Sequence, residues 1–537
     1  MISHEVFYRA LTHYFPKKLP KKVAVALSGG VDSLCLTFLL KQYRDIYQPD
    51  LEIYTITIDH KYREGSYEEA QQIGEIVKKW NINHSIQQLN YDRKVKDITN
   101  FEEVARIKRY EKFYEYCSRN DIHSLFVGHN LNDQLETFIQ RLQQNSSIFG
   151  LIGLKGKGNL PLNDKIEAVH VYRPLLEFEK SEIIRTCREQ KVQWFEDSTN
   201  QDIGLTRRNF MRYLLSDIIP KGEIQRNDIR HENLKLNNSY PRDQNSLSII
   251  SKESLIQTHE EIVSLTNLLL EKSYNLYSLL NSSGMIEFHN ENASMTIKIP
   301  NFIINKENSL VLSRFLYIVL YSISSVKHYH WSYGKVERQL VPKLIEYVNR
   351  GNEKIEKVVV DEDLQTPNLT QCTQLCEEPS SSPIRLTYLN LMFTCIQDKS
   401  YMCLDIQRQP MLRDHDVSFE ITISSNWSDW KLYDRRYWLR LCSNSSISVK
   451  VVPYDHGSHR EFLHPLILNK ISLLKKMNGV PVLLHDSHII SIPTYNVNIP
   501  DVKVEWRLKN NIWLNDLKER FENIRNESTL EGDATIE

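Results

Sequence analysis

The sequence predicts an α/β domain, then a helical region and a strand-rich end. From about residue 22 to 220, short β-branched runs alternate with helical patterns. Apolar residues then recur at helical spacing from 253 to 349, and short strand-like runs return after about residue 415. Strands that alternate with helices imply parallel βαβ units, with helices on both faces of the sheet. We therefore expect an N-terminal parallel sheet covered by helices.

The predicted elements of the first domain, residues 1–220, follow in order along the chain. Strands are expected at 22–27, 51–58, 84–89 and 125–127, and helices at 34–40, 66–80, 101–118 and 131–142. Before them, apolar residues such as Phe7 and Leu11 recur at helical spacing among basic residues and a single acid, Glu5. This segment fits either a helix packed under the first strand or an organelle transit peptide.

Composition divides the rest of the chain. Residues 221–250 are polar and are predicted to be a linker or insertion, followed by a helical middle domain at 251–360. Residues 361–400 carry Pro and Ser and are predicted to be a polar, irregular linker. The last domain, residues 401–537, is expected to be α+β, because strand patterns dominate it.

Charge, hydropathy and cysteine usage narrow the classes of protein. Lys and Arg number 67 against 68 Asp and Glu, so any nucleic-acid site must come from a local basic surface. No apolar run approaches the ~18 residues of a membrane span, so no membrane partner is expected. Among eight cysteines only Cys372 and Cys376 lie close together, which favours unpaired thiols in a reducing compartment over a metal site.

The strongest motif is Ser28-Gly29-Gly30-Val31-Asp32-Ser33, between a predicted strand and a predicted helix. Glycines permit a tight turn, and amides at a helix N-terminus bind anions. An aspartate beside a polyphosphate indicates a Mg²⁺ ligand or a base. The segment resembles the signature of the PP-loop ATP pyrophosphatases, which cleave ATP between the α and β phosphates. The resemblance implies a Rossmann-like fold that uses ATP and Mg²⁺.

Four further segments are similar to those of tRNA(Ile)-lysidine synthetases. They are Asp59-His60-Lys61-Tyr62-Arg63, the Arg106 to Tyr110 helix, Gly128-His129-Asn130-Leu131-Asn132-Asp133-Gln134, and residues 196–202 with Arg207 to Arg212. Asn130 and Asn132 stand where the family has His and Asp, and Ser198 replaces a Pro. Because Asn lacks charge, we expect weaker or rearranged metal binding at Asn132.

The resemblance implies a role for each residue of these motifs. The implied sets are catalytic Asp32, Asp133, Arg106 and Arg208; ATP-binding Ser28, Gly29, Gly30, Val31, Asp32, Ser33, His60 and Arg212; base-binding Arg109, His129 and Asn132; and metal-binding Asp32 and Asp133. The implied reaction adenylates the C2 oxygen of the wobble cytidine of tRNA(Ile) with a CAU anticodon. L-Lysine then displaces AMP to give lysidine, while the C-terminal domain binds the tRNA.

Two other functions stay open at this point. A PP-loop tRNA thiolase would usually have Lys at position 31 and paired cysteines, whereas this chain has Val31 and no such pair in its first 220 residues. A degenerate tRNA-binding homologue without catalysis is the other, because of Asn130 and Asn132. Abundant Lys, Ile and Asn indicate an AT-rich genome, and the divergent second half favours a eukaryotic organellar member. We expect a mitochondrial location, with the cytoplasm as the alternative. A homodimer is compatible with the sequence.

The resemblance thins beyond residue 220. The segment Asp434-Arg435-Arg436-Tyr437-Trp438 and the strands from Gly479 to Leu483 and from Ile489 to Pro493 look like C-terminal elements of longer lysidine synthetases. Asp434 and Arg436 would alternatively only shape a β-turn.

Overall fold

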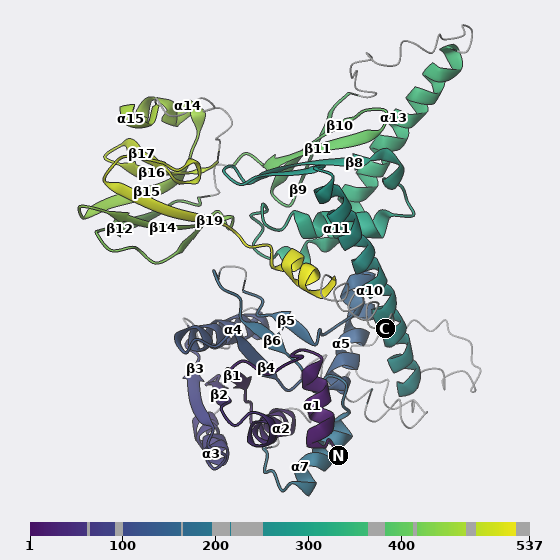
Figure 1. The fold of residues 1–537 in the computed structure, drawn as a ribbon, viewed down its shortest axis with the longest axis vertical. Helices are drawn as coiled ribbons and strands as arrows, with labels where there is room; N and C mark the ends of the chain where they lie inside the picture. Colours follow the sequence, from purple (N-terminus) through teal and green to yellow (C-terminus); the bar gives the residue numbers. More distant parts are fainter. Residues whose placement is uncertain are drawn as a thin grey trace, which may run out of the picture. The chain divides into compact units, whose positions relative to one another are not determined.

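A computed structural model of the chain describes residues 1–61, 65–91, 100–162, 165–195, 215, 251–362, 382–411, 416–468 and 479–521. The chain divides into two compact units, Met1–Thr266 and Asn267–Glu537 (Figure 1). The boundary lies within helix α10 (Lys252–Ser282). It falls after the predicted domain end at residue 220, because the start of α10 packs with the first unit.

The first unit contains a six-stranded sheet of order β3-β2-β1-β4-β6-β5. Its strands are β1 (Lys22–Ala26), β2 (Glu52–Asp59), β3 (Asn83–Gln88), β4 (Ser124–Val127), β5 (Lys157–Asn159) and β6 (His170–Tyr172). All pairs are parallel except β5 with β6, which is antiparallel. The predicted parallel sheet is confirmed, with an antiparallel edge that the sequence pattern did not reveal.

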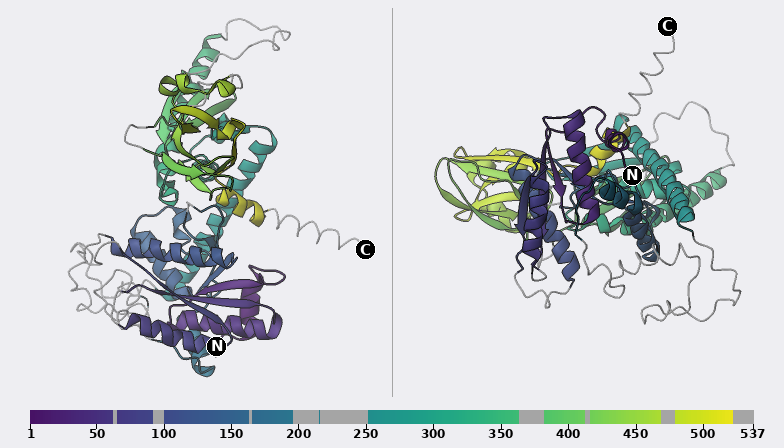
Figure 2. Two further views of the ribbon diagram at one scale, coloured as in Figure 1. Left: turned by 90° about the vertical axis from the view of Figure 1, so that its left-hand side faces the viewer. Right: turned by 90° about the horizontal axis from the view of Figure 1, so that it is seen from below.

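Helices cover both faces of this sheet (Figures 1 and 2). They are α1 (His4–Thr12), α2 (Val31–Tyr47), α3 (Ser66–Lys78), α4 (Phe101–Arg119), α5 (Leu131–Gln143), α6 (Ile148–Leu151) and α7 (Lys180–Glu189). One core joins β1 to residues of α1, α2, α3 and α7, such as Leu11, Leu36 and Ile183. A second core packs α4 through Phe113 and Cys117 against Leu125 of β4. The sheet is thus buried on both sides, which holds the loops at its carboxyl edge in place.

Helix α1 is the packed helix that the apolar spacing predicts. Phe7 and Leu11 are buried in the core beside α2, and the side chain of Ser3 accepts a hydrogen bond from the Val6 amide as the N-cap. Packing on the core accounts for this apolar face.

The second unit contains three antiparallel sheets. Their orders are β7-β8-β11-β10-β9, β12-β15-β16-β17-β18 and β13-β14-β19. The strands are β7 (Ile286–His289), β8 (Ser294–Pro300), β9 (Ile384–Tyr388), β10 (Leu391–Gln397), β11 (Tyr401–Arg408), β12 (Phe419–Ile423), β13 (Lys431–Tyr433), β14 (Tyr437–Ser443), β15 (Ile447–Pro453), β16 (Pro481–His485), β17 (His488–Ile492), β18 (Val497–Asn498) and β19 (Val502–Leu508). The strand-rich C-terminal region predicted from the sequence is therefore confirmed.

Helices of this unit come mostly from the predicted middle region. They include α11 (Ser309–Val319), α12 (Tyr333–Lys335), α13 (Val341–Glu362), α14 (His456–His459) and α15 (Pro465–Leu468), with the 3₁₀ helices η5 (Asn301–Ile303), η6 (Tyr329–Trp331), η8 (Arg460–Phe462) and η10 (Pro493–Tyr495) and the π-helical η7 (Val336–Leu340). A further helix covers residues 512–521. The hairpin β7–β8 lies between α10 and α11, so the region is not purely helical as predicted.

The predicted irregular linker at 361–400 is wrong for its second half. Strands β9 and β10 occupy Ile384–Tyr388 and Leu391–Gln397. In β10, buried Leu391, Phe393 and Cys395 alternate with less buried neighbours. One face of an antiparallel sheet can meet water, so its polar residues resemble a linker in composition. Residues 363–381, with Cys372 and Cys376, and the predicted linker at 221–250 lie outside the described residues.

Candidate active site

The loop after β1 lies where the strand order reverses. Strand β1 has β2 on one side and β4 on the other, so the loops after β1 and β4 leave the sheet next to each other. A Cβ added to Gly128, after β4, would be 2.9 Å from the carbonyl carbon and oxygen of Asp32. Since real Cβ atoms do not approach that closely, glycine at 128 lets the two loops meet. Ligands of open α/β sheets bind at this kind of junction.

Gly29 shapes the first loop. Its φ is +84°, a left-handed conformation that side chains disfavour, and an added Cβ would be 2.3 Å from Cδ1 of Ile73. The Gly29 carbonyl also accepts a hydrogen bond from the Phe195 amide at 3.0 Å. The loop is therefore held in one conformation by contacts on both sides.

Hydroxyl groups and helix amides line the same loop. The Ser33 hydroxyl donates to the Gly30 carbonyl at 3.0 Å and accepts from the Ser28 amide at 3.2 Å, and the Ser28 and Ser33 Oγ atoms are 3.2 Å apart. Helix α2 starts at Val31, and its N-cap, Gly30, makes no side-chain capping bond. The first amides of this helix therefore suit an anion such as a phosphate.

Asp32 is held between a cation and an amide. Its Oδ1 accepts a hydrogen bond from Asn130 Nδ2 at 2.9 Å, and its Oδ2 forms an ion pair with Lys180 Nζ. The side chains of Lys180 and Asp32 are 37% and 25% exposed, so both can reach a ligand from solvent. Sequence reasoning missed Lys180, which lies 148 residues from Asp32 and matches no motif.

The asparagine at position 130 takes a structural role that the sequence comparison did not anticipate. Asn130 is the N-cap of α5: its Oδ1 accepts from the amides of Asn132 and Asp133 at 2.9 and 3.2 Å. Asp133 Oδ2 accepts from the Asn130 amide at 3.1 Å and completes a capping box. Asn132 Oδ1 accepts from the Lys180 amide at 3.4 Å. Two amides thus join α5 to Asp32 and to α7.

His129 faces a buried arginine. Arg173, directly after β6, donates from Nε to His129 Nδ1 at 3.0 Å and from Nη1 to the Lys155 carbonyl at 2.8 Å. Burial lowers the pKa of Arg173 from its ordinary value. Since Nδ1 accepts, the geometry assigns the proton of neutral His129 to Nε2.

Gln134, the other motif residue of α5, closes a turn. Its Nε2 donates to the carbonyls of Ile152 and Leu154 at 2.9 and 3.1 Å, and its Oε1 accepts from the Leu154 amide at 2.7 Å. The turn contains Gly153 with a φ of +72°. Gln134 therefore stabilises the segment that leads to β5.

Arginines predicted to bind substrate gather at one ring. Arg106 Nε donates to the Tyr110 hydroxyl at 3.1 Å, and the guanidinium carbons of Arg106 and Arg109 are each 5.6 Å from the Tyr110 ring centroid. Burial raises the pKa of Tyr110, but Arg106 and Arg109 outweigh it and lower the pKa overall. Burial and the charge of Arg109 lower the pKa of His60, which favours the neutral form near neutral pH. The structure thus brings together three predicted site residues, His60, Arg106 and Arg109.

Known proteins resemble this chain in sequence. A family model described as a PP-loop domain matches residues 3–219. A probable tRNA(Ile)-lysidine synthase of Schizosaccharomyces pombe is 30% identical over 226 residues, 40% of this chain and 48% of that protein. The tRNA(Ile)-lysidine synthase of Rickettsia rickettsii is 33% identical over 195 residues, 36% of this chain and 38% of that protein.

A tRNA(Ile)-lysidine synthase of Mycoplasma mycoides is 30% identical over 313 residues, which are 54% of this chain and 75% of that protein. This chain belongs to the tRNA(Ile)-lysidine synthase family. The predicted resemblance is confirmed, although the match spans less than half of the Schizosaccharomyces and Rickettsia proteins.

The family implies Mg²⁺, and the donor chemistry at Asp32 fits this ion. Mg²⁺ prefers one or two carboxylates together with substrate phosphates and water. Within the described ranges no group of three or more His, Cys, Asp or Glu residues could hold a metal ion. Asp32 lies in the first turn of α2, directly after the loop that follows β1. Asn130 links it to Asp133, because the Asn130 side chain donates to Asp32 and the Asn130 amide donates to Asp133. A site completed by ATP phosphates is therefore compatible with these residues.

Asp59, which belongs to a predicted motif but was given no role of its own, ends β2. Asp59 Oδ1 accepts from the Lys61 amide at 2.9 Å and from the Ser66 hydroxyl at 2.7 Å, and the residue is buried. These bonds tie the end of β2 to the start of α3 and thereby position His60. Tyr62, Arg63, the block 196–202, and Arg207, Arg208 and Arg212 lie outside the described residues.

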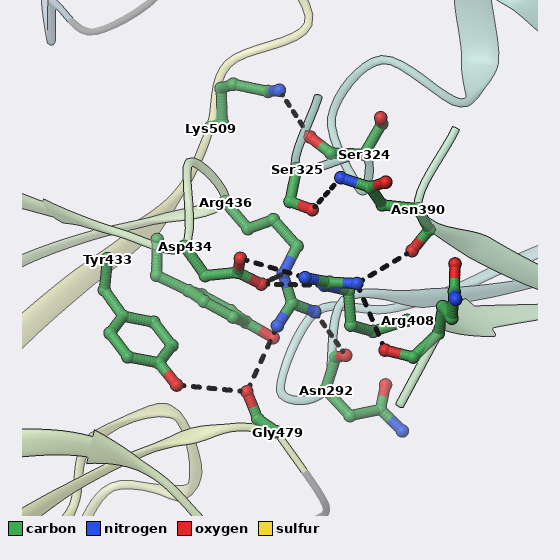
Figure 3. Close-up of polar contacts among 12 residues, drawn as sticks. Asn292, Ser324, Ser325, Asn390, Arg408, Tyr433, Asp434, Arg436, Gly479 and Lys509 are labelled. Carbon is green, nitrogen blue, oxygen red and sulfur yellow. Dashed lines mark hydrogen bonds and ion pairs between the residues drawn. The ribbon is translucent and has the colours of Figure 1, made fainter. Parts of the chain in front are cut away.

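The C-terminal family segment forms a buried ion cluster in the second unit (Figure 3). Asp434 Oδ2 pairs with Arg408 Nε at 3.0 Å and with Arg436 Nε at 2.7 Å. Arg436 also donates to the Gly479 carbonyl at 3.1 Å, and Lys509 Nζ donates to the Ser324 carbonyl at 2.9 Å. Asp434 and Arg435 have φ values of 42° and 55°. Asp434 thus lies in the turn between β13 and β14, but with Arg436 it also joins this turn to Arg408 of β11 and to Gly479, which is more than the shaping of a turn.

None of the helices in the described ranges is long and apolar enough to span a bilayer.

Proposed function

We propose that this protein is an ATP-dependent tRNA(Ile)-lysidine synthase. It would adenylate the C2 oxygen of the wobble cytidine in a CAU anticodon, releasing pyrophosphate, and L-lysine would then displace AMP at C2. One observation carries the proposal: a phosphate-binding loop with Asp32 lies at the sheet's switch point in a chain of this family. The arginines around Tyr110 and the His129–Arg173 pair add a place for the base.

The first step needs a held triphosphate and a stabilised leaving group. Ser28, Ser33 and the first amides of α2 would bind phosphate oxygens, because the two hydroxyls lie 3.2 Å apart at the N-terminus of this helix. Asp32, with Asp133 nearby, would hold Mg²⁺, which would neutralise charge on the departing pyrophosphate. Attack by the cytidine C2 oxygen on the α-phosphorus breaks the bond to the β-phosphate.

The base must be splayed out of the anticodon loop and held. Arg106 and Arg109 are paired through Tyr110 and suit the phosphates and base edge of the RNA. His129 carries its assigned proton on Nε2 and could donate it to a cytosine acceptor. These groups come from α4 and from the ends of β4 and β6, which the sheet brings together.

The second step needs a neutral amine. The ε-amine of lysine has an ordinary pKa of about 10.4, so a carboxylate must bind the ammonium or take its proton. Asp32 already pairs with an alkylammonium, that of Lys180, which shows that such a group fits beside the loop. We assign the role to Asp32 or Asp133.

A surface in the second unit supports tRNA binding. The guanidinium of Arg440 lies 5.1 and 5.0 Å from the rings of Trp427 and Trp430, and that of Arg507 lies 4.7 Å from Trp430. Layered aromatic and guanidinium groups stack on unpaired bases and bind phosphates. We expect tRNA affinity to fall as salt rises, and Arg507→Ala to reduce that salt dependence.

The test is an assay with ATP, L-lysine and a tRNA(Ile) transcript bearing CAU. Lysidine formation is expected, scored by the mass of the anticodon nucleotide, with AMP and pyrophosphate produced. A transcript with a different wobble base is the control. Cleavage of ATP only to ADP, or an unmodified nucleotide with full ATP present, would contradict the proposal.

A degenerate tRNA-binding homologue is the second candidate, motivated by Asn130 and Asn132. It predicts tRNA binding without pyrophosphate release. Asn130 donates a hydrogen bond to Asp32, so the asparagine keeps a contact with the proposed catalytic carboxylate, which supports an active enzyme over a degenerate one. A thiolase would instead add sulfur to the tRNA in the same mass assay. Residence in mitochondria and assembly as a homodimer stay predictions.

A further inference from the structure

Lys180 is fixed at the active centre by its backbone. It is the first residue of α7, whose N-cap is Glu179. Its amide donates to Asn132 Oδ1 at 3.4 Å, and the neighbouring Phe178 carbonyl accepts from the Leu131 amide at 3.0 Å. The start of α7 is thus joined twice to the start of α5.

The side chain of Lys180 reaches the phosphate loop. Its Nζ pairs with Asp32 Oδ2, while Asn130 binds the other carboxylate oxygen at 2.9 Å. A strongly exposed ion pair would contribute little, but this pair lies at a helix N-terminus and a glycine loop that both suit an anion. Lys180 therefore places a positive charge where phosphate oxygens are expected.

A lysine and a divalent cation cannot both neutralise the same carboxylate oxygen. When a cation binds Asp32, the ion pair between Lys180 and Asp32 must break. Repulsion between the two positive charges then moves the ammonium away from the metal. The ammonium is a point charge on a long aliphatic side chain, so it can turn toward a new anion without movement of α7. The nearest anions would be the β- and γ-phosphates of ATP.

We propose that Lys180 is a positioning and phosphate-binding residue that exchanges Asp32 for the ATP polyphosphate when a divalent cation binds. This rests on the proposed function for the identity of the nucleotide. Lys180 then stabilises charge on the leaving pyrophosphate. The exchange also makes cation and ATP binding mutually favourable, since each relieves the cost of displacing Lys180.

Binding measurements test the exchange without turnover. ATP affinity in excess EDTA and affinity for Mn²⁺ alone are measured by calorimetry and by electron paramagnetic resonance. For Lys180→Met we expect ATP to bind roughly 10-fold more weakly and Mn²⁺ alone roughly 10-fold more tightly. A purely structural role would not move the two affinities in opposite directions. Unchanged affinities, or changes in the same direction, overturn the proposal.

The matched control is Lys252→Met, which removes an ion pair to Glu179 at 3.0 Å beside Lys180 but not one to Asp32. Neither affinity should change in this variant. If Lys180→Met fails to fold, Lys180→Gln, which keeps a polar end, undergoes the same two measurements with the same expected directions.

Turnover separates this proposal from the proposed function. Pyrophosphate release by Lys180→Met should fall roughly 100-fold, as for loss of a transition-state charge contact, and Lys180→Arg should recover part of it. If the wild-type protein makes lysidine and Lys180→Met keeps full turnover, the exchange is wrong and the function stands. If the wild-type protein makes no lysidine but Lys180→Met still changes the ATP and Mn²⁺ affinities in opposite directions, the exchange stands and the proposed function is wrong.

Discussion

Asp32 in the first unit and Asp434 in the second both pair with basic side chains, but they differ in solvent exposure. Asp32 and Lys180 keep side-chain exposures of 25% and 37%. Asp434, Arg408 and Arg436 keep only 1%, 8% and 1%, and their remaining donors bind backbone carbonyls. A buried charge that loses its partner is costly, whereas an exposed pair can exchange partners. The exposed Asp32 pair therefore suits the catalytic role proposed above, whereas the buried Asp434 cluster suits a role in folding.

The largest expected effect breaks the buried cluster. Asp434→Ala leaves two arginines buried without their carboxylate, and we expect it to lower the free energy of unfolding by about 3–5 kcal/mol. Thermal unfolding, with hydrogen exchange used to follow β13 and β14, measures this loss. Asp405→Asn, at an exposed position of β11, should change stability by less than about 0.5 kcal/mol. If Asp434→Ala lost ATP binding while the amides of β14 stayed protected from hydrogen exchange, the folding role of Asp434 would be contradicted.

The second prediction removes the charge of the exchangeable aspartate. Asp32→Asn should reduce pyrophosphate release roughly 100- to 1,000-fold while the unfolding midpoint changes little, because the group acts on the reacting phosphates. Asp45→Asn on the same helix, which breaks a surface pair with Lys41, is the matched control. Full turnover by Asp32→Asn would exclude this carboxylate as essential.

The third prediction asks whether the active loop depends on backbone shape rather than on buried charge. Gly29→Ala places a methyl group 2.3 Å from Ile73 Cδ1 at a φ of +84°, and we expect a loss of about 2 kcal/mol in stability. Gly30→Ala meets no atom closer than Ser28 Oγ at 3.7 Å, so it should be less destabilising. Thermal unfolding of the two variants measures this difference. Equal unfolding midpoints would show that the loop changes conformation to accommodate the methyl group at position 29.

The last prediction concerns the pH dependence of stability caused by Lys509, beside the buried cluster. Burial lowers its pKa to about 7, whereas the unfolded chain keeps a pKa of about 10.4. Between these values the unfolded state binds more protons, so the free energy of unfolding rises with pH by up to about 1.4 kcal/mol per unit. Below the lower value both states are protonated and the full burial penalty remains. Lys509→Met should abolish this slope in denaturant titrations; an unchanged slope would assign it to other groups.

The sequence by itself determined the local parts of this protein. Apolar periodicity located β1 to β4 and α2 to α5, because a strand or helix must bury one face whatever its neighbours are. The glycine motif predicted a tight turn after the first strand, where Gly29 has a φ of +84°, since turn geometry depends on a few adjacent residues. Composition failed at β9 and β10, where a solvent-facing side resembles a linker.

Only the tertiary structure decided which charged groups meet. Lys180 and Asp32 are 148 residues apart, and no periodicity or motif relates them. The strand order brings the ends of β1, β4 and β6 together, and this order depends on the packing of helices on both faces of the sheet. Burial likewise separates Asp434 from Asp32, because solvent access is a property of the folded chain and not of a motif.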